Sequence, residues 1–332
     1  MLPVNILTGF LGSGKTTLLR HILEAQEFGD SMVLVNEFGE VGLDHILIGE
    51  ISPDVVLLNS GCLCCTLRGE VRDSLSEILS KRTRGEIPPF KRVIIETTGL
   101  AQPSLLLSTV FADPQIRHHY TVGAVATTVD SLNAKMQSTA QEEWSNQVAA
   151  ADTVVLTKTD LVDDASEARD IVRAINPTAR IISGADLEIA NLFNNSAEQF
   201  SSDAAELKKS RFTTEEATAW MGADSATSAH GNVSTIRICT ESPIDWEAFG
   251  VWLSMLLHAH GDRIMRVKGI LNIAESEGPV VIQGVQYVIY PPEHLDAWGR
   301  IPKQTDLVFI VRGIETEAIE RSFNAFVLKD KT

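Results

Sequence analysis

The sequence lacks an excess of basic residues, a disulfide framework and a long apolar run, and each absence excludes a class of protein. Its 28 Lys and Arg are outnumbered by 44 Asp and Glu, and the net charge of −16 argues against nucleic acid or an anionic membrane as a partner. Three of the four cysteines lie too close together to build such a framework. No apolar run could span a bilayer, and the opening does not read as a signal peptide, so we expect a cytoplasmic protein.

The length and composition indicate two globular domains. The chain has 332 residues, whereas a single core stops growing at roughly 250–300 residues. Hydrophobic residues make up 44% and charged residues 22% of the sequence, which is ordinary for a soluble globular protein. We assign residues 1–193 to a first domain, 194–232 to a Ser/Ala/Glu-rich linker and 233–332 to a second domain.

A phosphate-binding loop pattern stands near the start of the chain. An apolar run at residues 4–7 leads into GFLGSGKTT, where Lys15 and Thr16 follow the spaced glycines. Glycines let backbone amides turn inward around a polyphosphate, and the following helix N-terminus adds partial positive charge. We expect Lys15 to reach the β- and γ-phosphates and the Thr16 hydroxyl to coordinate Mg²⁺. The expected nucleotide contacts of this loop are Gly9, Gly12, Ser13, Gly14, Lys15, Thr16 and Thr17.

Strand and helix patterns alternate through the first domain. Strands are expected at residues 4–7, 32–35, 55–58, 92–95, 121–129, 152–156 and 180–182, and helices at 17–26, 67–84, 133–136, 142–150 and 164–175. This alternation predicts an α/β fold of the P-loop NTPase type, a doubly wound and mostly parallel sheet that binds ligands at the carboxyl ends of its strands.

The second domain has a different pattern, with strands grouped together and two flanking helices. Strands are expected at residues 233–239, 263–273, 279–289 and 307–311, and helices at 245–257 and 315–324. This order predicts a smaller α+β domain with an antiparallel sheet. Cys239 alternates with apolar residues in the first of these strands, and we expect it in the core.

A carboxylate follows the strand at residues 92–95. In nucleotide-hydrolysing sheets an acidic residue at this place holds Mg²⁺, often through water, and a nearby glycine amide can sense the γ-phosphate. We therefore expect Glu96 to act with Lys15 and Thr16 in catalysis, and Gly99 to contact the nucleotide. The alternative is a solvated glutamate near a helix N-terminus.

The sequence TKTD at residues 157–160 bears on the choice of base. A carboxylate at Asp160 can accept hydrogen bonds from the N1–H and N2 amino groups of guanine, and adenine lacks that pair of donors. The stem of Lys158 would pack over the base. Thr157 occupies a position where Asn is commoner, so the sequence does not show which polar contact this residue makes. A preference for GTP follows, because a site built for those donors rejects analogues without them.

Cys62, Cys64 and Cys65 form a dense cluster. Soft thiolates favour Zn²⁺, Cu⁺ or a similar ion over Mg²⁺. Three ligands leave a coordination position open, which Glu37 or Glu40, water or a partner protein could fill. A redox-sensing pair and inert buried thiols are the alternatives.

These motifs resemble a known family. GFLGSGKTT, NEFGEVGLD, GCLCC, IIETTG and TKTD, in this order, look like the CobW-type metallochaperone GTPases, relatives of the urease and hydrogenase nickel-insertion GTPases. HGDRIMRVKGILN and LVFIVRGI look like that family's second domain. The resemblance covers nearly the whole chain, and many members carry a His-rich loop that is missing from this sequence.

The resemblance implies a slow Mg²⁺-dependent GTPase that binds a transition metal, Zn²⁺ or Co²⁺, at the cysteine cluster and delivers it to a client protein. It also makes Glu37 a candidate metal ligand. Under this hypothesis the γ-phosphate orders residues 36–44, completes the metal site, and releases it on hydrolysis. A GTP-gated binding module with redox-sensing thiols, and a cobalt or iron insertion factor for cobalamin biosynthesis or nitrile hydratase, are the competing hypotheses. A homodimer is left open.

Overall fold

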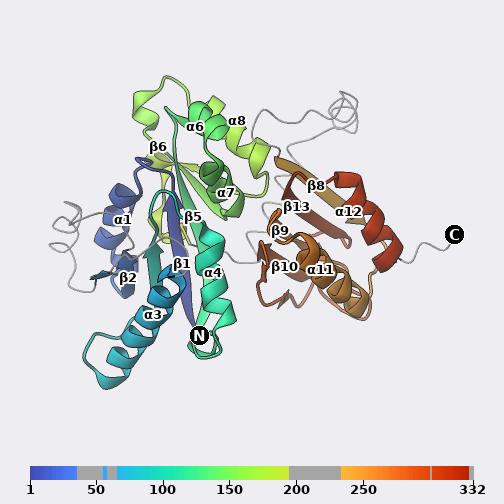
Figure 1. The fold of residues 1–332 in the computed structure, drawn as a ribbon, viewed down its shortest axis with the longest axis horizontal. Helices are drawn as coiled ribbons and strands as arrows, with labels where there is room; N and C mark the ends of the chain where they lie inside the picture. Colours follow the sequence, from blue (N-terminus) through green and yellow to red (C-terminus); the bar gives the residue numbers. More distant parts are fainter. Residues whose placement is uncertain (36–54, 58–65, 194–232, 300, 329–332) are drawn as a thin grey trace. The chain divides into compact units, whose positions relative to one another are not determined.

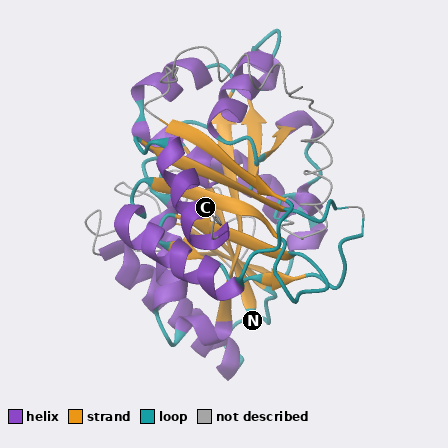
Figure 2. Ribbon diagram, turned by 90° about the vertical axis from the view of Figure 1, so that its right-hand side faces the viewer, coloured by secondary structure: helices purple, strands orange, loops and turns teal. Residues whose placement is uncertain are grey.

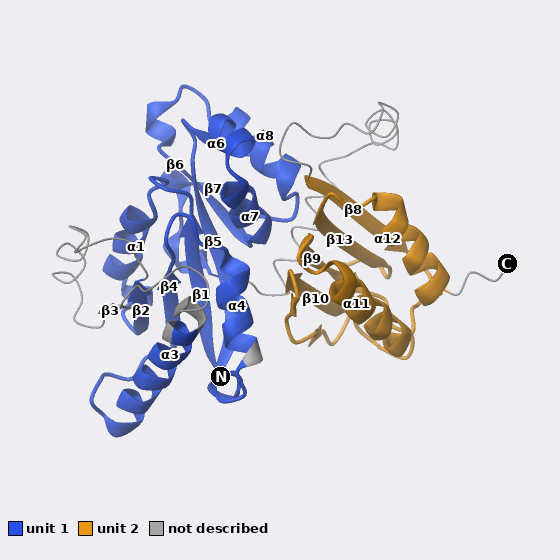
Figure 3. Cartoon of the chain, in the orientation of Figure 1, with its two compact units in different colours: residues 1–194 blue, residues 195–332 orange. Residues whose placement is uncertain are grey.

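The computed structural model describes residues 1–35, 55–57, 66–193, 233–299 and 301–328. The chain divides into two compact units, residues 1–194 and 195–332, which are coloured separately in Figure 3. Each unit has its own sheet, and each is described by itself. Figure 2 shows the helices in purple and the strands in orange. Within the described part of the chain, no helix is both long and apolar enough to cross a membrane.

The first unit contains a seven-stranded sheet in the order β3-β2-β4-β1-β5-β6-β7. All of its strand pairs are parallel. The strands are β1 (Leu2–Gly9), β2 (Ser31–Val35), β3 (Val55–Leu57), β4 (Arg92–Glu96), β5 (Tyr120–Asp130), β6 (Thr153–Thr157) and β7 (Arg180–Ser183). The prediction of a doubly wound α/β fold is confirmed.

Helices connect these strands and cover both faces of the sheet (Figure 1). They are α1 (Lys15–Glu24), α3 (Thr66–Arg84), α4 (Pro103–Ala112), α5 (Ile116–His119), α6 (Ala134–Ala140), α7 (Glu142–Ala150) and α8 (Ser166–Ile175). Successive strand residues face opposite sides. Ala126 of β5 accordingly belongs to the cluster that α1 covers, whereas the Thr127 hydroxyl donates to the backbone of α7 on the other face.

Several features of the first unit differ from the sequence prediction, among them the short helix α5, which was not predicted. Helix α4 was not predicted, because its sequence PSLLLSTVFA is apolar on most sides and has no amphipathic period. Leu106, Leu107 and Val110 are all at most 2% exposed, as expected of a helix enclosed by its neighbours. Helix α6 also continues to Ala140, beyond the predicted end at residue 136.

The second unit is an α+β domain with an antiparallel sheet, as predicted. Its strands are β8 (Val233–Thr240), β9 (Ile264–Leu271), β10 (Val280–Val285), β11 (Val288–Ile289), β12 (Glu293–His294) and β13 (Thr305–Arg312), in the order β11-β10-β9-β13-β8 with β12 beside β10. Its helices are α11 (Trp246–His260) and α12 (Thr316–Phe323), and a short π-helical turn follows at Asn324–Leu328.

The core of the second unit is built around Trp252 of α11. Its ring lies edge-on to Phe309 of β13 at 5.9 Å and to Phe323 of α12 at 5.1 Å, measured between centroids. The indole N–H donates to the Ser322 hydroxyl at 3.0 Å, so this large side chain is buried with its polar atom satisfied.

Two details of the second unit correct the sequence prediction. Cys239 is exposed, because β8 turns Ile236 and Ile238 into the core and an odd-numbered residue beside them must face outward. The predicted strand at residues 279–289 is a hairpin, since the chain reverses at Gln286, a non-glycine residue with a φ of 52°.

A buried asparagine holds the end of α7 to the start of β6. The Asn176 amide group donates to the carbonyls of Val148, Ala149 and Ala151 at 2.9–3.1 Å. Its own oxygen accepts from the backbone and hydroxyl of Thr178. One side chain thus ties the last turn of α7 to the residues that follow it.

We expect Asn176→Ala to lower the free energy of unfolding of the first unit by about 3 kcal/mol, because buried carbonyls lose their donor. Chemical denaturation followed by circular dichroism measures this change. Gln115→Ala, at an exposed position, is the control and should stay within about 0.5 kcal/mol of the parent. Equal stabilities of both variants would show that the asparagine is not a structural tie.

Candidate functional site

Five strands of the first unit end in residues that bear on a nucleotide site. The strand β1 ends at Gly9, β4 at Glu96, β5 at Asp130, β6 at Thr157 and β7 at Ser183. The register pairs Leu7 with Glu96 and Asp130 with Thr157. Because the strands are parallel, these ends meet at one edge of the sheet, where ligands bind in open α/β folds.

The phosphate-binding loop has the backbone that its glycines predict. Gly12 and Gly14 have φ of 71° and 88°, in the left-handed region. Gly9 has a φ of 145°, and a Cβ there would lie 2.2 Å from the Thr128 hydroxyl oxygen. Gly14 directly precedes α1 and has no side chain to cap it, so the first-turn amides of that helix are suited to bind an anion.

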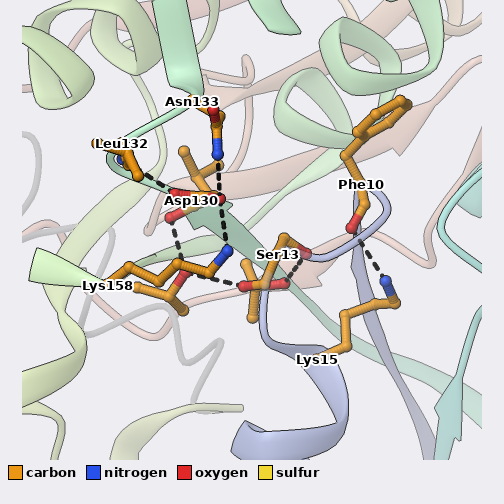
Figure 4. Close-up of polar contacts among 10 residues, drawn as sticks. Phe10, Ser13, Lys15, Asp130, Leu132, Asn133 and Lys158 are labelled. Atoms are coloured by element: carbon orange, nitrogen blue, oxygen red, sulfur yellow. Dashed lines mark hydrogen bonds and ion pairs between the residues drawn. The ribbon is translucent and has the colours of Figure 1, made fainter. Parts of the chain in front are cut away.

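Lys15 and Ser13 make different contacts within this loop (Figure 4). The Lys15 ammonium donates to the carbonyls of Gly9 at 2.9 Å and Phe10 at 3.1 Å. It therefore lies across the loop, where a phosphate would meet it. The Ser13 hydroxyl is fully buried and lies 2.6 Å from the Thr128 hydroxyl. It braces the loop from within the protein, which leaves Ser13 only its backbone for a nucleotide.

Thr16 and Glu96 lie together, as the sequence predicted for a magnesium site. The Thr16 hydroxyl donates to Glu96 Oε1 at 3.0 Å. Glu96 is only 5% exposed. A hydroxyl and a carboxylate are hard oxygen ligands, and Mg²⁺ is typically held by one or two carboxylates together with phosphate oxygens. The donor set therefore fits Mg²⁺.

The loop after β4 packs against the phosphate-binding loop. A Cβ on Gly99 would lie 2.7 Å from the Leu11 backbone nitrogen, so only glycine allows this approach. The Ala101 amide donates to the Thr98 carbonyl and closes a turn around Gly99. At the start of the loop, the Thr97 hydroxyl donates to the Thr8 hydroxyl at 2.8 Å.

Thr157 connects the loop after β6 to the phosphate-binding loop. Its hydroxyl lies within hydrogen-bond distance of the carbonyls of Ser13 at 2.8 Å and Val129 at 3.1 Å. The sequence left one polar contact open at this position because Thr replaces Asn. The hydroxyl supplies a backbone contact between the two loops.

Lys158 is held in an uncommon conformation by an ion pair. Its φ of 54° places a non-glycine residue in the left-handed region. Its ammonium lies 2.7 Å from Asp130 Oδ2, and the Asp130 side chain is 2% exposed (Figure 4). Asp130 also accepts from the Asn133 amide group and the Leu132 backbone. Burial alone raises the pKa of Asp130, but these hydrogen bonds outweigh it and hold the pKa below its ordinary value.

The next residues of this loop extend toward solvent and toward β7. Asp160 is exposed, in a short 3₁₀ turn at Thr159–Leu161. The Thr159 and Ser183 hydroxyls lie 3.4 Å apart, and the Ala185 amide donates to Ser183. The base-reading candidates Thr157, Lys158 and Asp160 therefore share one loop, which contacts the phosphate-binding loop through Thr157.

Other predicted residues fall outside the part that the structure describes. These are Glu37, Glu40 and the three cysteines at positions 62, 64 and 65. The described residues contain no group of three or more His, Cys, Asp or Glu side chains that could hold a metal ion.

Sequence reasoning missed two residues of this site. Asp130 directly follows the predicted strand at residues 121–129, so the rule that selected Glu96 could have selected it as well. Gln147 lies inside α7, where the sequence predicts only a helix. Its side chain donates to the carbonyls of Gly99 and Ala101. No sequence signal marks that contact.

Both halves of the chain match known families. Residues 3–183 match the description "CobW/HypB/UreG, nucleotide-binding domain", and residues 233–327 match "Cobalamin synthesis protein cobW C-terminal domain". The zinc chaperone YjiA of Escherichia coli (strain K12) is 31% identical over 325 residues, covering 97% of this chain and 98% of that protein.

Further similarity is found to shorter segments and to a solved structure. The zinc-regulated GTPase metalloprotein activator 1 of Schizosaccharomyces pombe is 36% identical over 191 residues, covering 54% of this chain and 45% of that protein. A crystal structure of a Zn(II)-bound triple mutant of the YjiA GTPase superposes with a TM-score of 0.69 at 25% identity, covering 98% of this chain and 99% of that one.

We expect Asp130→Asn to destabilise the first unit by about 1–2 kcal/mol at pH 7, because Lys158 loses its buried counter-charge while staying partly hydrated. The lowered pKa of Asp130 means that the stabilisation is complete above the ordinary carboxyl pKa of about 3.9. It is lost as the pH falls through the lower folded pKa. The difference between parent and variant should therefore shrink below about pH 4.

Urea denaturation of both proteins at several pH values measures this difference. Asp170→Asn, at an exposed position on α8, is the matched control and should follow the parent. A difference between parent and Asp130→Asn that stays constant from pH 7 to pH 3 would contradict the assignment of the ion pair.

Proposed function

This chain belongs to the CobW/HypB/UreG family, and on that premise we propose that it is a metallochaperone GTPase that carries zinc to a client protein. The observation that carries the proposal is the convergence of a phosphate-binding loop, a carboxylate at Glu96 and the loop after β6 at one edge of a parallel sheet. We choose zinc as the metal because the names of two relatives contain it.

The phosphates of GTP would lie on the loop from Gly9 to Thr17. Lys15 already lies over the loop carbonyls and would exchange these for phosphate oxygens. Thr16 and Glu96 would hold Mg²⁺, which neutralises charge that develops on the phosphates. None of the motifs GFLGSGKTT, IIETTG and TKTD contains an arginine that could stabilise the transition state, and we therefore expect slow intrinsic turnover.

The base would lie on the loop from Thr157 to Asp160. The exposed Asp160 carboxylate is suited to accept the two guanine donors, and the Lys158 stem is suited to cover the ring. The contact between Thr157 and Ser13 supports this placement, because it brings the base loop within hydrogen-bond distance of the phosphate loop.

The cargo would be bound by Cys62, Cys64 and Cys65, with Glu37 as a fourth ligand. Thiolates favour zinc or cobalt over Mg²⁺, and three thiolates with one carboxylate suit tetrahedral zinc. YjiA and the Schizosaccharomyces pombe protein carry zinc in their names, which favours zinc over cobalt.

Nucleotide binding and metal binding would be coupled. Couplings between sites are typically about 1–3 kcal/mol, or roughly 5–150-fold in affinity. A complete handover needs about 10⁴-fold, so a metal-requiring client that captures the ion would finish the transfer. We place this exchange in the cytoplasm.

Asp160→Asn should weaken GTP binding by about 100-fold and favour xanthosine triphosphate. Xanthine carries a carbonyl where guanine has its amino group, and the Asn amide can donate to it. Isothermal titration with the two nucleotides measures the preference. Asp163→Asn, three residues further on and also exposed, should keep the GTP preference. A variant at Asp160 that still prefers GTP would exclude it as the base reader.

Cys64→Ala should retain GTP affinity but bind zinc at least tenfold more weakly and lose any effect of zinc on hydrolysis. Competition with a chromophoric zinc chelator, in the GDP form and with a non-hydrolysable GTP analogue, measures both affinities. Cys239→Ala is the control, because that thiol lies exposed on β8 of the second unit. Equal zinc affinity in the Cys64 variant and the parent would exclude the cluster, and reversible oxidation without bound zinc would favour a redox role.

A further inference from the structure

Gln147 is a buried polar residue that links helix α7 to the loop after β4. Its side chain is 0% exposed. Its amide nitrogen donates to the Gly99 carbonyl and to the Ala101 carbonyl, each at 3.0 Å. Both bonds connect residues more than 40 positions apart in the chain. The glutamine therefore uses both of its N–H groups on one short loop.

The orientation of this amide group is determined by its neighbours. Reversing the group would place its oxygen against two carbonyl oxygens, which repel it, so the assignment with two donated bonds is the stable one. In this orientation Gln147 Oε1 is buried and has no hydrogen-bond partner among the residues that the structure describes.

The backbone of Gln147 is anchored independently of its side chain. The Thr127 hydroxyl of β5 donates to the Gln147 carbonyl at 3.0 Å. Helix α7 ends where the Asn176 amide contacts two of its final carbonyls, those of Val148 and Ala149, and the carbonyl of Ala151, the next residue after the helix. The amide thus projects from a helix that the sheet holds in place, and it can act as a fixed point for a loop.

The loop that Gln147 holds lies against the phosphate-binding loop. Gly99 approaches Leu11 so closely that a Cβ would lie 2.6 Å from the Leu11 side chain. A carbonyl oxygen carries partial negative charge and would repel a γ-phosphate, whereas a backbone N–H attracts one. Two carbonyls of this loop are bonded to the buried Gln147 amide instead.

We propose that Gln147 is a positioning residue for recognition of the γ-phosphate: it holds the Gly99 and Ala101 carbonyls inward, so that the loop presents the Gly99 N–H and not these carbonyls to the terminal phosphate of GTP. This inference rests on the proposed function, since it assumes a guanine nucleotide on the phosphate-binding loop. GDP has no γ-phosphate, so its affinity depends little on Gln147.

Gln147→Met tests the inference, because methionine keeps the shape of the side chain and removes both donors. We expect the affinity for a non-hydrolysable GTP analogue to fall about tenfold, and the affinity for GDP to stay within twofold. The kcat/KM for GTP should fall accordingly. Fluorescence titration with labelled nucleotides and a phosphate-release assay measure these values on the full-length protein.

A second variant separates positioning from general stability. Gln137→Met replaces another buried glutamine, on α6. It should keep the parent's ratio of GTP to GDP affinity, even where the melting temperature falls.

The outcomes distinguish the two proposals. A parent protein that binds no guanine nucleotide would overturn the proposed function and this inference together. A parent that prefers GTP, with the same preference in Gln147→Met, would overturn this inference alone. An equal loss of GTP and GDP affinity in Gln147→Met would also overturn it, since that is the result of a purely structural role.

Discussion

Parallel pairing of β5 with both β1 and β6 is the constraint on which the site depends. The register places Gly9 beside Thr128 and Asp130 beside Thr157. A one-residue shift of β5 would turn Thr127 toward α1 and away from α7, and would separate Asp130 from Lys158. Because strand order and register are set by buried apolar residues, the geometry of the polar edge follows from the packing of the sheet beneath it.

Much of this fold could be predicted from the sequence, since apolar β-branched runs indicate buried strands and a repeat of apolar residues about every 3.6 positions indicates amphipathic helices. Glu96 and Thr157 could be recognised because each directly follows an apolar run. The glycines of the phosphate loop could be recognised by their spacing before Lys15 and Thr16. The helix at Pro103–Ala112 could not be recognised, because a helix enclosed by its neighbours has no polar face. Cys239 was misplaced because alternation alone does not say which of two faces is buried.

The contacts that determine how the loops behave were harder to predict than the motifs themselves. The Ser13 hydroxyl reads as a nucleotide contact in the motif, yet it is buried beside Thr128. Gln147 reaches Gly99 from 48 positions away, and no spacing rule connects the two. Such contacts depend on how a helix lies on a sheet, which local patterns do not encode.

The Thr157 hydroxyl has a single proton and two carbonyls within reach, those of Ser13 and Val129. An asparagine in its place would offer two protons, one for each carbonyl. Rotation about the Cβ–Oγ1 bond turns the hydroxyl proton from one carbonyl to the other. The loop after β6 and the phosphate-binding loop can therefore separate without leaving the Thr157 donor unused.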